Sequence, residues 1–162
     1  MELQTKVHAE DNRQDLTITR QFALPVGLLF KAYTEAPFIE QWMGTKVLKH
    51  ESRKHGSWAF ETADAQGQVV FRAHGVIHEF EPGRRITRTF EMENAPFGAQ
   101  LEFLEFEALG ETSSRLRIHS VYRSVQQRNQ MLQLPFAKGL NMAHNRLQEV
   151  VSQLITRHEP EK

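Results

Sequence analysis

Histidine and arginine residues on expected strands are the residues of this sequence best suited to chemistry. His74 and His78 stand four residues apart in an alternating segment, so we expect them to share one face of a strand. About 13 Å along the strand would separate them, which is too far for two ligands of one zinc ion. Arg88 shares the expected inward face of Ile86 and Phe90. A guanidinium buried there needs a partner, either the acid group of a ligand or an internal carboxylate. If the strand instead lies at the open edge of the sheet, Arg88 is in water, and all three alternatives stay open.

The patterns of other common catalytic sites are missing. No serine stands in a nucleophile-elbow pattern, no glycine-rich loop has the spacing of a phosphate-binding loop, and no carboxylates form a recognisable acid–base pair. The chain contains no cysteine, which excludes a disulfide framework, a thiol nucleophile and a thiolate metal site. We therefore expect no catalytic residue, no metal site and no cofactor, and we favour binding over enzymatic activity.

The composition narrows the range of partners. The twenty basic and twenty acidic residues cancel. Basic clusters such as Arg84-Arg85 are short and flanked by acids, so the charge pattern of a nucleic-acid-binding protein is missing. No apolar run is long enough to span a membrane, and the N-terminus does not resemble a signal peptide. We expect a cytoplasmic protein without a nucleic-acid partner or a membrane span.

The segment 15–44 predicts the order of the first elements. Apolar residues alternate in its first part, at Leu16, Ile18, Phe22 and Leu24. This is typical of a half-buried strand, on which Arg20 is the polar exception. Pro25 ends the strand and suits the first turn of a helix. Thr34 is the candidate N-cap of a second short helix, which Gly44 closes.

Beyond Gly44, alternating segments separated by turn residues predict a succession of strands. These segments are 45–51, 57–62, 68–80, 85–93, 100–108 and 114–124. With the first strand they make about seven strands, and the helices lie near the two ends of the chain, which is the α+β pattern. Gly75 is expected to mark a bulge or bend. The inward face of 100–108 stays open because its apolar residues do not alternate strictly.

The C-terminal part predicts one long amphipathic helix over about 139–157, which must lie on the sheet. Its apolar stripe consists of Leu140, Ala143, Leu147, Val150, Val151 and Leu154. We interpret 125–138, which contains Pro135, as a mobile lid leading into this helix. Residues 1–14 and 158–162 are polar and are expected to be flexible, which leaves 15–157 as a single domain.

Several motifs occur along most of the chain. They are Ile18-Thr19-Arg20 with Phe22 and Pro25, Gln41-Trp42-Met43-Gly44, Trp58 with Phe60, the stretch from Gly75 to Pro82, and Gly139 with Leu147. Through them the sequence resembles the activator-of-Hsp90-ATPase-homologue-like (AHSA1-like) branch of the START/polyketide-cyclase superfamily, also called SRPBCC or Bet v 1-like. Glu51 and His55 depart from the usual aspartate and glycine. The resemblance implies a helix-grip fold, in which a curved antiparallel sheet wraps around a long C-terminal helix.

A helix-grip fold tends to leave a cavity between the sheet and the helix, and strand phase predicts which residues line it. The expected ligand-binding residues are Trp58, Phe60, His74, His78, Phe80, Arg88, Phe90, Tyr122, Met131 and Phe136. Taken singly, each apolar member of this set also suits plain core packing.

The favoured function is binding of a hydrophobic or amphipathic small molecule, for example a lipid-like molecule or an aromatic acid, without chemistry. The resemblance adds two alternatives. One is an Hsp90-type co-chaperone or protein-interaction domain, for which the sequence shows no dedicated charged or apolar strip. The other is a cyclase/aromatase-like enzyme, which would need an acid or base such as His74, His78 or Arg88 in the cavity.

Overall fold

A single curved antiparallel sheet is the framework of the computed structural model, which describes residues 3–93 and 95–158. Within those residues its strands are β1 (Lys6–His8), β2 (Asp15–Phe22), β3 (Lys46–His50), β4 (Ser57–Ala63), β5 (Val69–Glu81), β6 (Arg85–Met92), β7 (Ala99–Gly110) and β8 (Ser113–Val121). Their order in the sheet is β1-β2-β8-β7-β6-β5-β4-β3. The second strand, β2, therefore pairs with the last strand, β8.

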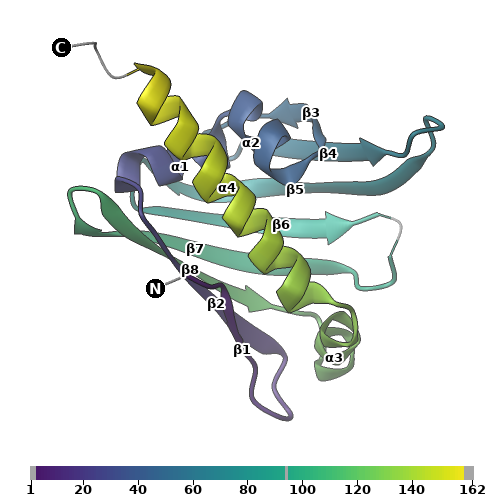
Figure 1. Ribbon diagram of the computed structural model, residues 1–162. Coiled ribbons are helices and arrows are strands. Elements are labelled where there is room, and N and C mark those ends of the chain that lie inside the picture. Colours follow the sequence, from purple (N-terminus) through teal and green to yellow (C-terminus); the bar gives the residue numbers. More distant parts are fainter. Residues whose placement is uncertain (1–2, 94, 159–162) are drawn as a thin grey trace.

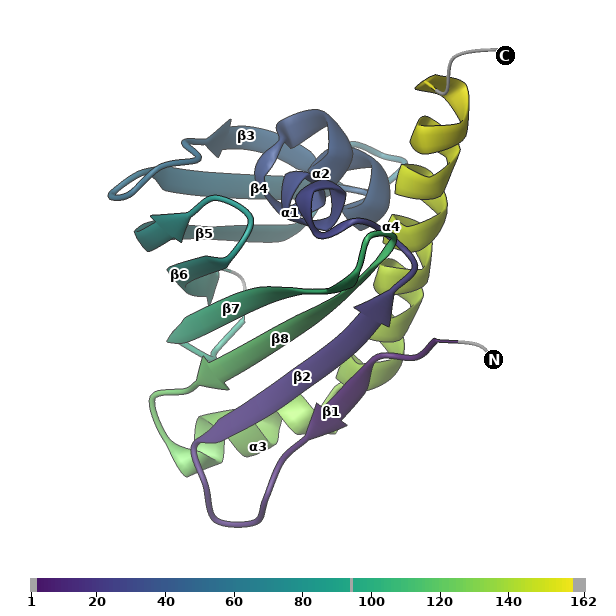
Figure 2. The same ribbon diagram turned by 90° about the vertical axis from the view of Figure 1, so that its left-hand side faces the viewer.

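The helices lie on one side of this sheet (Figures 1 and 2). They are α1 (Val26–Thr34), α2 (Ala36–Met43), α3 (Val125–Gln133) and α4 (Phe136–His158). Figure 1 shows α4 running diagonally across the strands, and Figure 2 shows the sheet bending around that side. The predicted α+β class, with a sheet wrapped around a long C-terminal helix, is confirmed.

The predicted apolar stripe of α4 faces the core. Leu147 and Val151 are almost completely buried, and Leu140, Ala143 and Val150 are half-buried. The helix begins at Phe136, three residues earlier than the predicted start at 139. Pro135 ends the short connection from α3 and stands immediately before α4, where its missing N–H costs no helical hydrogen bond.

The two short helices α1 and α2 form where predicted, but their caps differ. Pro25 is the N-cap of α1, and its carbonyl accepts hydrogen bonds from the backbone of residues 28 and 29. Thr34 is the last residue of α1 and not an N-cap, because its hydroxyl donates to the carbonyl of Phe30. Gly44 closes α2 in the left-handed region, at φ 64°. Trp42 anchors α2, since its indole N–H donates to the carbonyl of Ala32 at 2.7 Å.

Strand β1 lies inside the segment 1–14 that was predicted to be flexible. Its register pairs Lys6 with Thr19 and Val7 with Ile18. The preceding residue Thr5 donates its backbone N–H to the Oδ1 of Asn141 on α4 at 2.8 Å. The strand is too short to show an alternating pattern, so the sequence did not reveal it. Residues 159–162 of the predicted tail lie outside the described residues.

Gly75 marks a close approach of backbone to its neighbours, and the predicted bulge lies elsewhere. A Cβ at residue 75 would lie 1.9 Å from the carbonyl oxygen of Thr89 and 2.8 Å from the ring of Trp58. Only glycine fits this position without a shift of β6. The register of β5 against β6 shifts between Ile77 and Glu79 instead.

Replacing Leu147 by Asp should unfold the protein at moderate temperature. The change places an unpaired carboxylate under the centre of α4, which costs several kcal/mol, a large part of the stability of a typical domain. Met142→Asp is the matched control on the same helix, because Met142 is exposed. Thermal melting followed by circular dichroism measures both. Equal melting temperatures for the two variants would show that this stripe does not face the core.

Candidate functional site

A cavity of about 210 Å³ lies between the sheet and the helices. Its walls are mostly apolar and come from α1, α2, α3 and α4. These wall residues are Tyr33, Ile39, Trp42, Met43, Met131, Phe136, Leu140 and Ala143. The sheet contributes Ile18, Phe60, Phe90 and Ile118 together with a small polar group, Arg88, Gln100, Glu102 and Ser120. The cavity is therefore apolar except along one part of the sheet.

Sheet register brings the polar group together. Arg88 on β6 stands opposite Glu102 on β7, which stands opposite Ser120 on β8. The next inward residue of β7 is Gln100, which stands opposite Phe90. Three neighbouring strands thus supply one short row of polar side chains, which we call the polar row (Arg88, Glu102 and Ser120).

Arg88 and Glu102 form a largely buried ion pair. The distance from Arg88 Nε to Glu102 Oε1 is 2.9 Å, and their side chains are 11% and 10% exposed. The guanidinium also lies 5.1 Å from the ring centroid of Trp58 and 5.8 Å from that of Phe90. The other carboxylate oxygen of Glu102 accepts a hydrogen bond from Gln100 Nε2 at 2.9 Å. Of the alternatives for Arg88, the structure contains the pair with an internal carboxylate.

Ser120 places a hydroxyl group with an unsatisfied hydrogen bond on the cavity wall. Its Oγ is buried and has no hydrogen-bond partner among the described residues. A buried hydroxyl without a partner costs about 1–3 kcal/mol. The indole N–H of Trp58, whose ring lies beside the guanidinium of Arg88, is also buried and has no hydrogen-bond partner among the described residues. The cavity therefore offers a hydroxyl that can both donate to and accept from a polar group placed beside it.

Half of the predicted ligand-binding residues line this cavity, namely Phe60, Arg88, Phe90, Met131 and Phe136. Trp58 and Tyr122 point inward as predicted but are buried in the core. Phe80 also points inward, where its ring packs edge-on against Phe30 at 5.4 Å. That the five lining residues bind a ligand stays a prediction.

The predicted inward orientation of His74 and His78 is wrong. Both are exposed on the outer face of β5, where His74 Nδ1 lies 3.1 Å from Glu93 Oε2. The inward positions belong to Ala73, Gly75 and Ile77. The prediction assumed strict alternation backward from the inward-facing Phe80. The register shift after Ile77 inserts one residue into β5, and such an insertion exchanges the two faces of the strand.

Glu102 and Gln100 are the site residues that the sequence analysis missed. They belong to β7, the strand whose inward face the sequence did not determine. They lie on the same face as the buried Leu104 and Phe106, because the four residues follow one another at every second position. A signal did exist, because a buried Arg88 requires a carboxylate and Glu102 stands directly opposite it. The sequence alone does not say which carboxylate this is, and only the pairing of β6 with β7 identifies Glu102.

His144 forms a second buried polar contact, next to the cavity on α4. It has no solvent exposure, its Nε2 lies 2.9 Å from the hydroxyl of Tyr33, and its Nδ1 lies 2.7 Å from the hydroxyl of Thr5. Burial, together with the charge of Arg20, lowers the pKa of His144 to about 3. Neutral His144 therefore connects α1, α4 and the segment before β1.

The described residues contain neither a candidate metal site nor a candidate membrane-spanning helix. No three His, Asp or Glu side chains come together in a way that could hold a metal ion. Within residues 3–93 and 95–158, no helix is both long and apolar enough to cross a membrane.

Comparison with known proteins identifies the family. A family model described as Activator of Hsp90 ATPase homolog 1-like protein matches residues 23–152. The chain belongs to this family. The match begins immediately after β2 and reaches into α4, so it includes every strand and helix that lines the cavity except β2. No curated protein matches the chain.

Solved structures share the fold of this AHSA1-family chain. Protein Ms6760 from Mycobacterium smegmatis is 19% identical, with a TM-score of 0.79 over 92% of this chain and 96% of that one. A protein from Rhodobacter sphaeroides is 18% identical, with a TM-score of 0.81 over 94% and 99%. CalU16 from Micromonospora echinospora is 20% identical, with a TM-score of 0.66 over 97% and 90%. At these identities the likeness establishes the helix-grip fold alone.

Breaking the Arg88–Glu102 pair from one side should be costly. Arg88→Met leaves a buried carboxylate without its cation and should lower the free energy of unfolding by about 3–5 kcal/mol. The double variant Arg88→Met with Glu102→Gln should recover much of that loss, since no charge remains buried. Arg115→Met, which breaks the more exposed pair with Glu107, should cost under about 1 kcal/mol. Urea denaturation measures all of them, and a double variant no more stable than Arg88→Met would contradict this account.

Acidification should destabilise the protein well before its carboxylates are protonated. An unfolded histidine takes up a proton near pH 6.5, whereas folded His144 does so only near pH 3. The unfolded state therefore binds more protons between these values, and stability falls as the pH falls, by about 1.4 kcal/mol per pH unit for this histidine. His50, whose pKa burial lowers to about 4, adds to the effect in the same direction.

Above about pH 5, carboxylates of ordinary pKa stay ionised, so the histidines dominate the dependence of stability on pH there. Between about pH 6.5 and 5, His144→Gln should flatten the dependence of unfolding free energy on pH by up to one proton. Denaturant titrations at several pH values give the slopes. If wild type and His144→Gln have the same slope, His144 is not buried in its neutral form.

Proposed function

We propose that the protein reversibly binds a small amphipathic molecule in the cavity between the sheet and α4. The observation that carries the proposal is the one-sided polarity of this cavity, in which the unpartnered hydroxyl of Ser120 adjoins walls that are otherwise apolar. A ligand with one polar end would satisfy that hydroxyl and bury its apolar part against the helices. Membership of the family agrees in general with a ligand-binding or co-chaperone-type domain.

The charge balance of the polar row favours a neutral ligand. Glu102 already neutralises Arg88, and both of its oxygens are engaged. A carboxylate ligand would have to displace Glu102 from Arg88 or place its own negative charge beside that of Glu102. Like charges in a buried site repel strongly. We therefore propose a phenol, alcohol or ketone as the polar end of the ligand, in place of the aromatic acid that the sequence suggested.

The size of the cavity favours a compact ligand. Its volume of about 210 Å³ lies below the range of about 300–1,000 Å³ that is usual for small-molecule sites. Met131 of α3 and Phe136 of α4, both from the predicted lid 125–138, form part of the wall. Arg128 ties α3 to the β1–β2 connection through the carbonyls of Glu10 and Asp15. A larger ligand would require these side chains to move outward.

Binding without chemistry is favoured over a cyclase-like reaction. The titratable side chains on the cavity wall are Arg88, Glu102 and Tyr33. Glu102 is held by Arg88 and Gln100, and burial raises the pKa of Tyr33 above its ordinary value. General acid–base catalysis needs a positioned group that exchanges a proton near the working pH. The raised pKa of Tyr33 moves it away from that range, and both oxygens of Glu102 are already engaged.

A titration with matched ligands tests the proposal. Small phenols and cyclic alcohols should bind about tenfold or more tightly than carboxylic acids of the same skeleton, as followed by tryptophan fluorescence and by the rise in melting temperature. Ser120→Ala should weaken binding of the alcohols by about 0.5–1.5 kcal/mol, the usual worth of one hydrogen bond, and Ala143→Phe should abolish binding by filling the cavity. Ser113→Ala, at the start of β8 and outside the cavity wall, is the control. Tighter binding of the acids, or alcohol binding that survives Ala143→Phe, would refute the proposal.

A further inference from the structure

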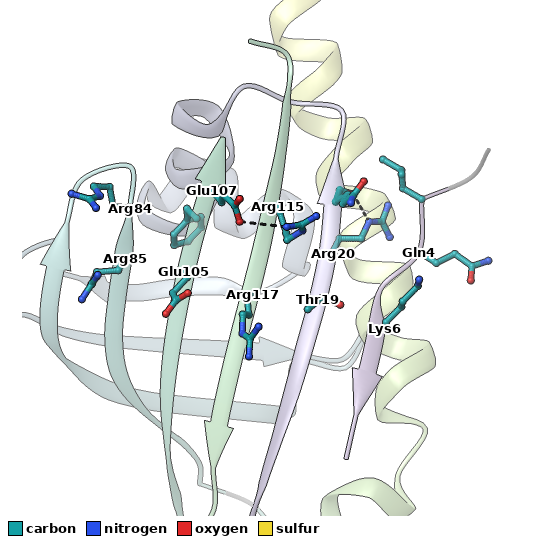
Figure 3. A pocket seen from close by; sticks show the side chains of 13 residues that line it. Gln4, Lys6, Thr19, Arg20, Arg84, Arg85, Glu105, Glu107, Arg115 and Arg117 are labelled. Carbon is teal, nitrogen blue, oxygen red and sulfur yellow. Dashed lines mark hydrogen bonds and ion pairs between the residues drawn. The ribbon is translucent and has the colours of Figure 1, made fainter. Parts of the chain in front are cut away.

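A second concave surface lies on the outer face of the sheet, on the side away from α4 (Figure 3). Its volume is about 1,040 Å³, which is larger than that of the cavity. Arg117 on β8 and Glu105 on β7 are exposed there, whereas their sequence neighbours Leu116 and Leu104 point into the core. We call this surface the outer groove, and its charged residues are Lys6, Arg20, Arg84, Arg85, Glu105, Glu107, Arg115 and Arg117.

Strand register places four of these residues in one row across the sheet. Lys6 stands opposite Thr19, Thr19 opposite Arg117, Arg117 opposite Glu105, and Glu105 opposite Arg85. Figure 3 shows Arg85, Glu105 and Arg117 on adjacent strands. Neighbouring strands are about 4.8 Å apart, so the row is about 19 Å long and its cationic positions recur about every 10 Å.

The outer groove is strongly cationic although the whole chain is neutral. Six basic side chains line it with two acidic ones, and one of the six, Arg20, is buried and hydrogen-bonded to Asn141 and Asn145. Arg115 pairs with Glu107 at 3.4 Å, and Arg85 pairs with Glu81 at 3.7 Å. Lys6, Arg84 and Arg117 make no ion pair with any residue that the structure describes. Their charges are available to a partner.

We propose that the outer groove docks an extended acidic segment of a partner protein. Charge complementarity is the first argument, because a surplus of cations on one face attracts and steers an anionic partner. The second is length, since about six residues of extended peptide span about 19 Å. This proposal concerns the opposite face of the sheet from the cavity, so it stands or falls independently of the proposed ligand.

The layout disfavours the other anionic partners. Cationic positions about 10 Å apart do not converge on a single phosphate, as a phosphate site would require. The aromatic residue of the outer groove, Phe106, is 6% exposed and offers no platform on which bases could stack. Glu105 and Glu107 would also repel a continuous phosphate backbone, whereas a peptide can place neutral residues beside them.

A labelled peptide of about eight residues that alternates glutamate and serine is the probe, and fluorescence polarisation is the readout. The full chain should bind it, with an affinity that falls as salt is added, and should not bind a glutamine–serine peptide of the same length. Arg84→Gln, Arg85→Gln and Arg117→Gln combined should weaken binding about tenfold or more. Lys54→Gln, Arg123→Gln and Lys138→Gln combined are the matched control, because these cations are exposed, lie outside the outer groove and remove the same charge.

Three results would overturn the proposal. The first is failure of the acidic peptide to bind at low salt. The second is an equal loss of binding in both triple variants, which would mean that only net charge matters. The third is tighter binding of a single-stranded oligonucleotide of the same charge. Melting temperatures of both variants close to that of the wild type ensure that a loss of binding is not a loss of fold.

Discussion

Burial of one face of α4 against the curved sheet is the interaction on which the rest of the structure depends. Leu147 and Val151 supply its apolar centre, and the sheet bends so that strands from both ends of the chain reach the helix. Every polar group enclosed by this packing needs a partner. Arg20 finds side-chain oxygens of Asn141 and Asn145, His144 lies between Tyr33 and Thr5, and Arg88 meets Glu102. The apolar space that the helix does not fill becomes the cavity.

Periodicity predicted the elements that it governs directly. The stripe of α4, the inward faces of β4 and β8, and the placement of Trp58 and Phe60 all follow from spacing of two or of three to four residues, because each element repeats its pattern several times. The face of β5 was predicted wrongly, since one inserted residue at the register shift exchanges the faces and leaves no mark in the composition. Strand β1 is three residues long, which is too short for any pattern.

The two candidate sites were harder to predict than the fold because both are made by pairing between distant strands. Glu102 becomes a site residue only when β7 lies beside β6, and the row of the outer groove exists only after five strands are in register. In the sequence, Arg84-Arg85 is a short basic cluster flanked by acids, and no charged strip is visible. Local reading of the chain therefore underestimates surfaces whose members lie more than a hundred residues apart, such as Lys6 and Arg117.

The two edges of the sheet have a consequence for the behaviour of the protein at high concentration. An open edge exposes unpaired backbone groups and can recruit strands from other molecules, which is a common origin of aggregation. Here one edge, β1, is only three residues long and carries Lys6. The opposite edge, β3, carries Lys46 and Lys49 and has an irregular register between Val47 and Lys49. Shortness, positive charge and irregularity make both edges poor templates, so the sheet can remain open at its sides without growing into larger assemblies.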